Sequence, residues 1–94
     1  MDIKQKSPYW YGDLNEDCCA KWSNLLLRAE RMYEKGGEAY WWWAVSSIET
    51  SEELYSSNSH SHLPNSGEDA RKCAETTARQ YFESMYLSLF RHVT

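Results

Sequence analysis

This sequence of 94 residues has no long apolar run, no even set of cysteines and no excess of positive charge. Its longest apolar run, residues 39–45, is far shorter than the roughly 18 residues that a membrane helix needs. The three cysteines, Cys18, Cys19 and Cys73, form an odd set with two adjacent members, whereas small secreted domains prefer even, spaced sets. The N-terminal residues also lack the apolar stretch of a secretory signal. These absences predict a cytoplasmic protein that does not enter a membrane.

The motifs that support catalysis and phosphate binding are missing as well. Neither glycine-rich phosphate-binding motif occurs, and no serine lies in a nucleophile elbow. His60 and His62 alternate as chelating histidines can, but a structural zinc site needs four ligands at defined spacings. We therefore expect no enzyme activity, no cofactor and no metal. A small metal-binding protein or enzyme that uses these two histidines is an alternative.

Large aromatic side chains are abundant instead. Only 41% of the residues are apolar, yet five are tryptophan and seven are tyrosine. A chain of this length builds one core, so we expect residues 1–94 to form a single domain with a core of a few large rings.

Residues 13–35 have the apolar spacing of a helix. Apolar residues recur every three or four positions from Leu14 to Tyr33. Asp13 has the position of an N-cap, and the glycine pair at 36–37 follows as a helix stop. These features predict a helix over 13–35, preceded by an N-terminal segment at 1–12.

A second helix is predicted for residues 67–91. Ser66 and Asp69 form a capping pattern ahead of it. Apolar residues follow at helical spacing, with alanines first and large side chains last, so a sheet can approach the first half closely. The polar residues 59–66 before this helix are predicted to form a loop.

Residues 39–58 are predicted to form a β-hairpin. β-forming residues dominate its first half, and alternation places Trp41 and Trp43 on one face and Trp42 on the other. A polar turn separates this strand from the returning one. A short helix that begins at Thr50 is the alternative to the returning strand.

The predicted fold class is α+β, in the order α-β-β-α. Two long helices pack on one face of a small antiparallel hairpin sheet in this prediction. The other face of the sheet would leave two large aromatic side chains in water, which is unfavourable by roughly 2–3 kcal/mol for each ring. The N-terminal segment, a second copy of the chain or a partner is expected to cover them.

The net charge of −4 is concentrated in the predicted hairpin. Residues 38–55 contain four glutamates and no basic residue, while the remaining segments are nearly balanced. Such a surface repels nucleic acid phosphates and attracts basic protein surfaces; a solvated acidic turn without a partner is the alternative. The residues expected to contact a partner are Glu38, Glu49, Glu52, Glu53, Trp42 and Tyr55.

Residues 66–78, which follow the predicted strand pair, resemble the alanine-rich second helix of a double-stranded RNA-binding domain. That resemblance implies an α–β–β(–β)–α order. The lysines that begin this helix in the family correspond to Glu68 and Asp69 here, which repel phosphate.

The tryptophan run at 41–43 before a polar turn, and residues 67–71 at the start of an alanine-rich helix, give the chain a second resemblance. In type it resembles small bacteriophage accessory proteins, including anti-CRISPR and other anti-defence inhibitors. This implies a non-enzymatic inhibitor in the host cytoplasm that blocks a basic or nucleic-acid-binding surface of a host protein complex.

An immunity protein that neutralises a cognate toxin is the alternative within the same binding class. For either function we expect a protein partner with a basic surface and no direct contact with nucleic acid or a membrane. A homodimer is a further alternative, because the apolar stripe that ends the last helix is broader than one facing helix requires. Its residues are Tyr86, Leu87, Leu89, Phe90 and Val93.

Overall fold

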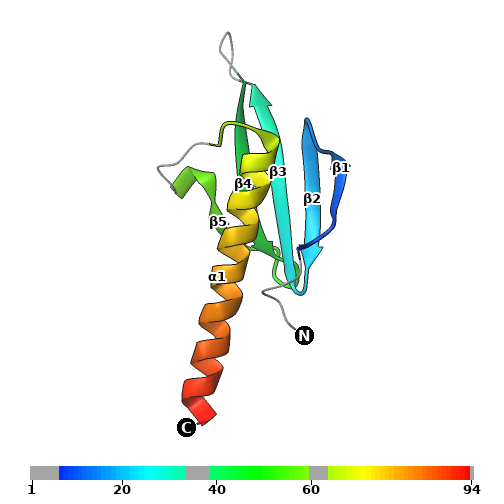
Figure 1. The fold of residues 1–94 in the computed structure, drawn as a ribbon. Helices are drawn as coiled ribbons and strands as arrows, with labels where there is room; N and C mark the ends of the chain where they lie inside the picture. The colour runs from blue at the N-terminus through cyan, green and yellow to red at the C-terminus, as the bar shows by residue number, and fades with distance from the viewer. Residues whose placement is uncertain (1–6, 34–38, 60–63, 94) are drawn as a thin grey trace.

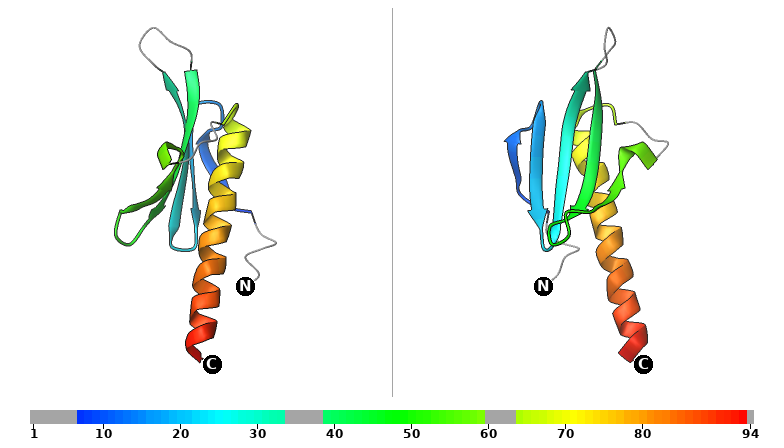
Figure 2. Two further views of the ribbon diagram at one scale, coloured as in Figure 1. Left: turned by 90° about the vertical axis from the view of Figure 1, so that its left-hand side faces the viewer. Right: turned by 180° about the vertical axis from the view of Figure 1, so that it is seen from behind.

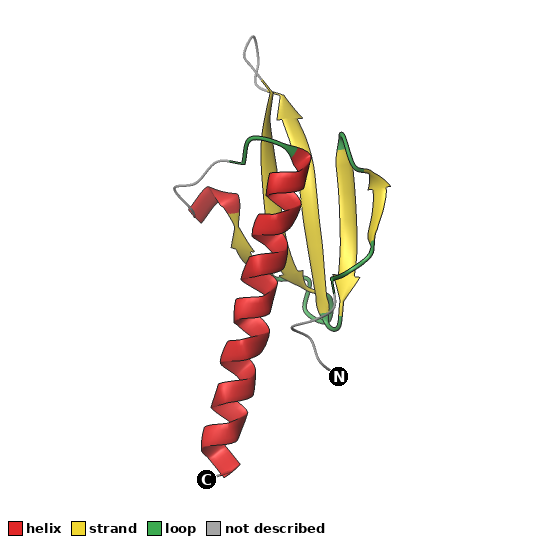
Figure 3. Ribbon diagram, viewed as in Figure 1, coloured by secondary structure: helices red, strands yellow, loops and turns green. Residues whose placement is uncertain are grey.

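The computed structural model describes residues 7–33, 39–59 and 64–93, of which 59 and 87–93 are described by their backbone alone. It consists of a five-stranded antiparallel sheet and one long C-terminal helix (Figure 1, Figure 3). Strand order in the sheet follows the order along the chain, so each strand pairs with the next. The elements are β1 (Trp10–Asp13), β2 (Asp17–Trp22), β3 (Leu25–Tyr33), β4 (Ala39–Ser47), β5 (Glu53–Ser56), the short 3-10 helix η1 (Ser57–Ser59) and α1 (Gly67–Val93).

The predicted order α-β-β-α, with two helices on a two-stranded sheet, is wrong. Residues 13–35 do not form a helix, because the described part of this segment forms the β1–β2 turn, β2 and β3. Burial along these two strands alternates with the period of two that is typical of a strand. The buried side chains are Cys18, Ala20 and Trp22 on β2 and Leu25, Leu27 and Ala29 on β3.

The acidic pattern that predicted a helix N-cap at Asp13 builds a turn instead. The Asp13 carbonyl accepts a hydrogen bond from the Glu16 amide at 3.0 Å, and its Oδ1 accepts one from the Asn15 amide at 2.9 Å. Aspartate makes this local bond in turns as readily as at helix starts. The pattern therefore marked a change of chain direction and not a helix.

The hairpin predicted at residues 39–58 is confirmed by the pairing of β4 with β5. Residues 48–50 form the turn, so the short helix beginning at Thr50 does not form. The predicted alternation on β4 is confirmed as well, because Trp43 and Val45 are buried beneath the helix while Trp42 lies on the opposite face.

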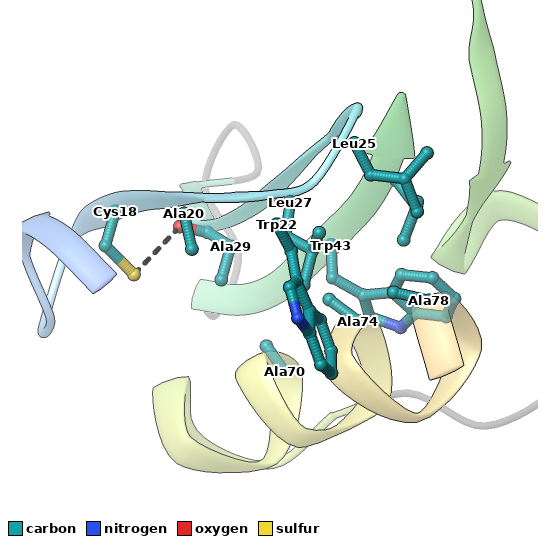
Figure 4. Packing of buried hydrophobic residues seen from close by; sticks show 11 residues of the cluster. Cys18, Ala20, Trp22, Leu25, Leu27, Ala29, Trp43, Ala70, Ala74 and Ala78 are labelled. Atoms are coloured by element: carbon teal, nitrogen blue, oxygen red, sulfur yellow. Dashed lines mark hydrogen bonds between the residues drawn. The ribbon is translucent and has the colours of Figure 1, made fainter. Parts of the chain in front are cut away.

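The second helix is also confirmed, as α1. The Asp69 amide donates to Ser66 Oγ at 3.1 Å, which is the predicted cap. Ala70, Ala74 and Ala78 are fully buried, and their small side chains let α1 lie close against β3 and β4 (Figure 4). Beyond this alanine face the helix leaves the sheet and projects past its end (Figure 2).

The main core cluster therefore lies between α1 and one face of the sheet, whereas the small side chain of Ala44 is buried on the other face. Its largest fully buried side chain is Trp43, which packs with Leu25, Leu27 and Val45. Trp22, on β2, closes the core through an edge contact with Phe82, the ring centroids being 5.5 Å apart. α1 packs on one face of the sheet only, and it is the one α-helix among the described residues (Figure 1, Figure 2).

Candidate protein-binding surface

The turn between β4 and β5 is fixed by its own hydrogen bonds. The Ser47 amide donates to the Glu52 carbonyl at 2.8 Å, and the Ser51 amide donates back to the Ser47 carbonyl at 2.8 Å. The Thr50 amide adds a bond to Ser47 Oγ at 3.3 Å, and Ser51 adopts a φ of 62°. The backbone amides of the turn are thus bonded within the turn itself, and none of these bonds uses a glutamate side chain.

Three glutamates stand at this end of the sheet. Glu49, Glu52 and Glu53 are all exposed, and none of them forms an ion pair with any residue that the structure describes. The preceding residue, Ile48, is 43% exposed and adds an apolar side chain to the turn. This acidic turn, residues 48–53, is therefore a compact negative surface with an apolar contact at its edge.

Tyr55 lies beside the acidic turn on β5. It pairs with Val45, which places it on the helix face of the sheet, and it is 40% exposed. Its ring makes an edge contact with Tyr81 of α1, with the centroids 6.3 Å apart. Tyr55 can thus extend the contact area of the acidic turn toward the helix.

Trp42 lies elsewhere. It pairs with Glu30, so its side chain is on the open face, whereas Tyr55 is on the helix face. The Arg28 guanidinium lies 5.5 Å from the Trp42 ring centroid and forms an ion pair with Glu30. The structure therefore separates Trp42 from the glutamates and the tyrosine with which the sequence grouped it.

The remaining sequence-predicted site residues are not brought to this surface. Glu38, His60 and His62 lie outside the described residues. Among the residues that are described, no group of three His, Cys, Asp or Glu side chains is arranged to hold a metal ion. Nor does that part of the chain contain a helix both long and apolar enough to cross a membrane.

The cysteines have the surroundings of packing residues. Cys18 is buried and its thiol donates to the Ala29 carbonyl at 3.7 Å (Figure 4). Burial raises the pKa of the Cys18 thiol, although the nearby Arg71 opposes part of that rise. Burial likewise raises the pKa of Cys73. Thiols with raised pKa values form little thiolate near neutral pH, so they are weak nucleophiles.

Sequence reasoning missed a second surface, on the open face around Arg28 and Trp42. The available signal was the alternation within β3, where Leu25, Leu27 and Ala29 point one way and Arg28 and Glu30 point the other. That alternation becomes visible only if the segment is interpreted as a strand.

Comparisons with protein families, with curated proteins and with solved structures found no match to this chain. Its function is therefore inferred from the residues that its own surfaces display.

Proposed function

We propose that this protein is a non-enzymatic inhibitor of the phage anti-defence, anti-CRISPR-like type, and that it binds a basic, nucleic-acid-binding surface of a host protein complex. The acidic turn is the contact, with Tyr55 as its aromatic neighbour. The single observation that supports the proposal is the presence of three exposed glutamates on one turn without an ion-pair partner among the described residues.

An acidic turn of this kind favours a basic protein over a nucleic acid. Like charges raise the free energy of contact with phosphates, whereas complementary charges accelerate association with a basic surface. Exposed charges act within a screening length of about 8 Å at physiological salt, so three carboxylates on one turn act together on the same patch. A host protein that holds nucleic acid in a basic groove offers such a patch.

The hairpin is also suited to hold the contact in place. The turn is closed by hydrogen bonds at both Ser47 and Thr50, and the strands on either side are paired. A preorganised turn loses little conformational freedom on binding, which leaves more of the interaction energy for affinity.

The test begins with affinity capture of a partner from host cells that the protein affects, followed by purification of that partner. Two variants are then compared with the wild type by biolayer interferometry. One combines Glu49→Lys with Glu52→Lys on the acidic turn, and the other combines Glu68→Lys with Glu83→Lys on the exposed side of α1. Both variants have the same net charge. The helix variant also loses the ion pair of Glu68 with Lys72, which is exposed on both sides and contributes little to stability.

We expect the turn variant to bind about tenfold more weakly or worse, with a slower association rate that depends less on salt. The helix variant should bind nearly as well as the wild type. The wild-type protein should also displace a labelled oligonucleotide from the partner. Equal affinity for all three proteins, or equal losses in both variants, would show that the acidic turn is not the contact.

A further inference from the structure

The open face of the sheet is a second surface, and it has the composition of an interface. Its outward side chains on β1 to β4 include Tyr11, which is 57% exposed, together with Tyr40 and the half-buried Trp42. The ring of Tyr9 packs against that of Tyr11, with centroids 4.9 Å apart. The half-buried residues Cys19, Leu26 and Met32 complete the apolar part of this face. Aromatic side chains and methionine are enriched in protein interfaces.

The chain itself does not cover this face in the part that the structure describes. α1 packs on the opposite side, as the view from behind shows (Figure 2). Ser7, the first described residue, accepts a hydrogen bond from Arg79 of α1 at 3.3 Å, so this end of the described chain lies on the helix side. An occupant of the open face must therefore come from outside the described chain.

On the open face, charged residues of opposite sign lie at opposite ends of β2. On β2 the outward residues are Asp17, Cys19 and Lys21, from the acidic end to the basic end. On β3, Glu30 pairs directly with Asp17, and Arg28 lies one step nearer to the Lys21 end. Asp13 of β1 pairs with Asp17 and adds to the acidic end. Around β2, one end of the face is thus acidic and the other carries Lys21. The nearest carboxylate in the row of Lys21 is Glu53 on β5, three strands away. This arrangement is complementary to itself when one copy is turned end over end.

We propose that two copies of the chain pack through their open faces, related by a two-fold axis that runs across the strands close to Cys19. Rotation about this axis places Asp17 of one copy opposite Lys21 of the other, twice. A rotation axis along the strands would instead place acidic ends together, which is unfavourable. Strands rise about 3.3 Å per residue, so Asp17 and Lys21 of one chain are about 13 Å apart and cannot pair with each other.

Arg28 and Glu30, the remaining charged residues of this face on β2 and β3, are compatible with this packing. Arg28 lies in the same cross-strand row as Cys19, so the two copies of Arg28 approach each other near the axis. Each guanidinium is already neutralised by the Glu30 of its own chain and stacked over Trp42. Packed sheets are separated by about 10 Å, which leaves room for these side chains and for the rings.

The proposal does not depend on the proposed inhibitor function. The acidic turn lies at the end of the hairpin, and Tyr55 is on the helix face, so both stay accessible in the dimer. A dimer would present two acidic turns.

A charge-swap series tests the proposal by sedimentation equilibrium of the full chain. Asp17→Lys and Lys21→Glu each turn two attractive contacts into repulsive ones, so each should weaken dimerisation by at least about tenfold. The double variant restores both contacts and should recover the wild-type dimer. Lys72→Glu, on the exposed side of α1, is the matched control and should dimerise as the wild type does.

A second measurement locates the axis. In a variant that keeps Cys19 alone, through Cys18→Ala and Cys73→Ala, a short bis-maleimide should cross-link two chains in high yield. A protein that stays monomeric at 200 micromolar (about a concentration at which weak dimers form) would overturn the proposal. So would a dimer that the charge series leaves unchanged, since that dimer uses another surface such as the projecting end of α1.

Discussion

The two faces of the sheet differ most clearly at neighbouring residues of the same strand. On β4, Trp43 is 2% exposed beneath α1, while Trp42 is half-buried on the open face under a guanidinium. On β2, Cys18 is buried in the core and Cys19 is on the open face. The same residue type, one position apart, contributes to the core on one side and to a surface on the other. The helix face therefore supports stability, and the open face is available for contact.

The helix face is closed because α1 offers small side chains to it. Ala70, Ala74 and Ala78 let the helix axis approach, and the large rings on the sheet side fill the space. The open face has rings, and none of the described residues forms a helix that covers it in this way. It follows that substitutions of the same type should have unequal effects on the two faces.

The largest expected effect is that of Trp43→Ala. It removes the largest fully buried side chain and leaves a cavity, so the free energy of unfolding should fall by roughly 3–5 kcal/mol in urea denaturation. Trp42→Ala is the matched variant and should reduce the free energy of unfolding by only about 1 kcal/mol, because its ring is partly solvated and leaves little cavity. Similar losses in both variants would mean that the two faces are equally packed.

Ala74→Leu should have the next largest effect. The alanine is fully buried where α1 meets the sheet, and the larger side chain must push the helix away, which costs about 1–3 kcal/mol. Thr76→Leu, on the exposed side of the same helix, is the control and should change stability by less than about 0.5 kcal/mol. Thermal unfolding measures both. An Ala74→Leu protein as stable as the wild type would show that the helix is not held close to the sheet.

Trp10→Phe should have a smaller effect, limited to the edge of the sheet. Trp10 Nε1 donates to Glu75 Oε2 at 3.0 Å and so ties β1 to α1. The substitution keeps an apolar ring but removes the donor, with an expected loss of about 0.5–1.5 kcal/mol. Hydrogen exchange should be faster for β1 amides. Tyr11→Phe, on the open face of the same strand, should leave hydrogen exchange and stability unchanged. Equal effects of the two substitutions would show that the hydrogen bond from Trp10 to Glu75 does not hold β1 to α1.

The smallest expected effect is a difference in reactivity between the thiols of Cys18 and Cys19, which needs no substitution. In dilute protein, Cys19 should react with iodoacetamide well before Cys18, as measured by mass spectrometry of the labelled peptides. Burial raises the pKa of Cys18 above its ordinary value of 9.0, so its thiolate is scarce below that pH. The stability associated with the neutral, buried thiol is present below pH 9.0 and is lost as the pH rises through the raised pKa. Equal labelling of both thiols would contradict the assignment of faces.

The sequence predicted some elements well, and these are the ones with local signals. The cap at Ser66 and the alanine stripe defined α1, and the alternation of tryptophans on β4 assigned its two faces. The glutamates of the acidic turn were predicted to form a surface that contacts a partner or is solvated, and all three are exposed. Each of these signals is contained within about one element's length of the chain.

The first predicted helix failed for a physical reason that β3 illustrates. Its residues from Leu25 to Met32 are mostly leucine, arginine, alanine, glutamate and methionine, which have high intrinsic helix propensity. In the fold this strand is central and pairs with β2 on one side and β4 on the other. Pairing on both sides and burial of one face outweigh a preference of a few tenths of a kcal/mol per residue.

The sequence by itself determined that this chain is acidic and rich in aromatic rings, with a capped C-terminal helix and a hairpin whose turn contains glutamates. Only the tertiary structure decided that the described part of residues 13–35 is extended and that Trp42 and Tyr55 lie on opposite faces. It also decided that one face of the sheet is left uncovered by the described part of the chain. The reason is the range of the interactions. Caps and turns depend on residues a few positions apart, whereas strand pairing joins distant residues, and the face that a side chain occupies depends on which strand becomes its neighbour.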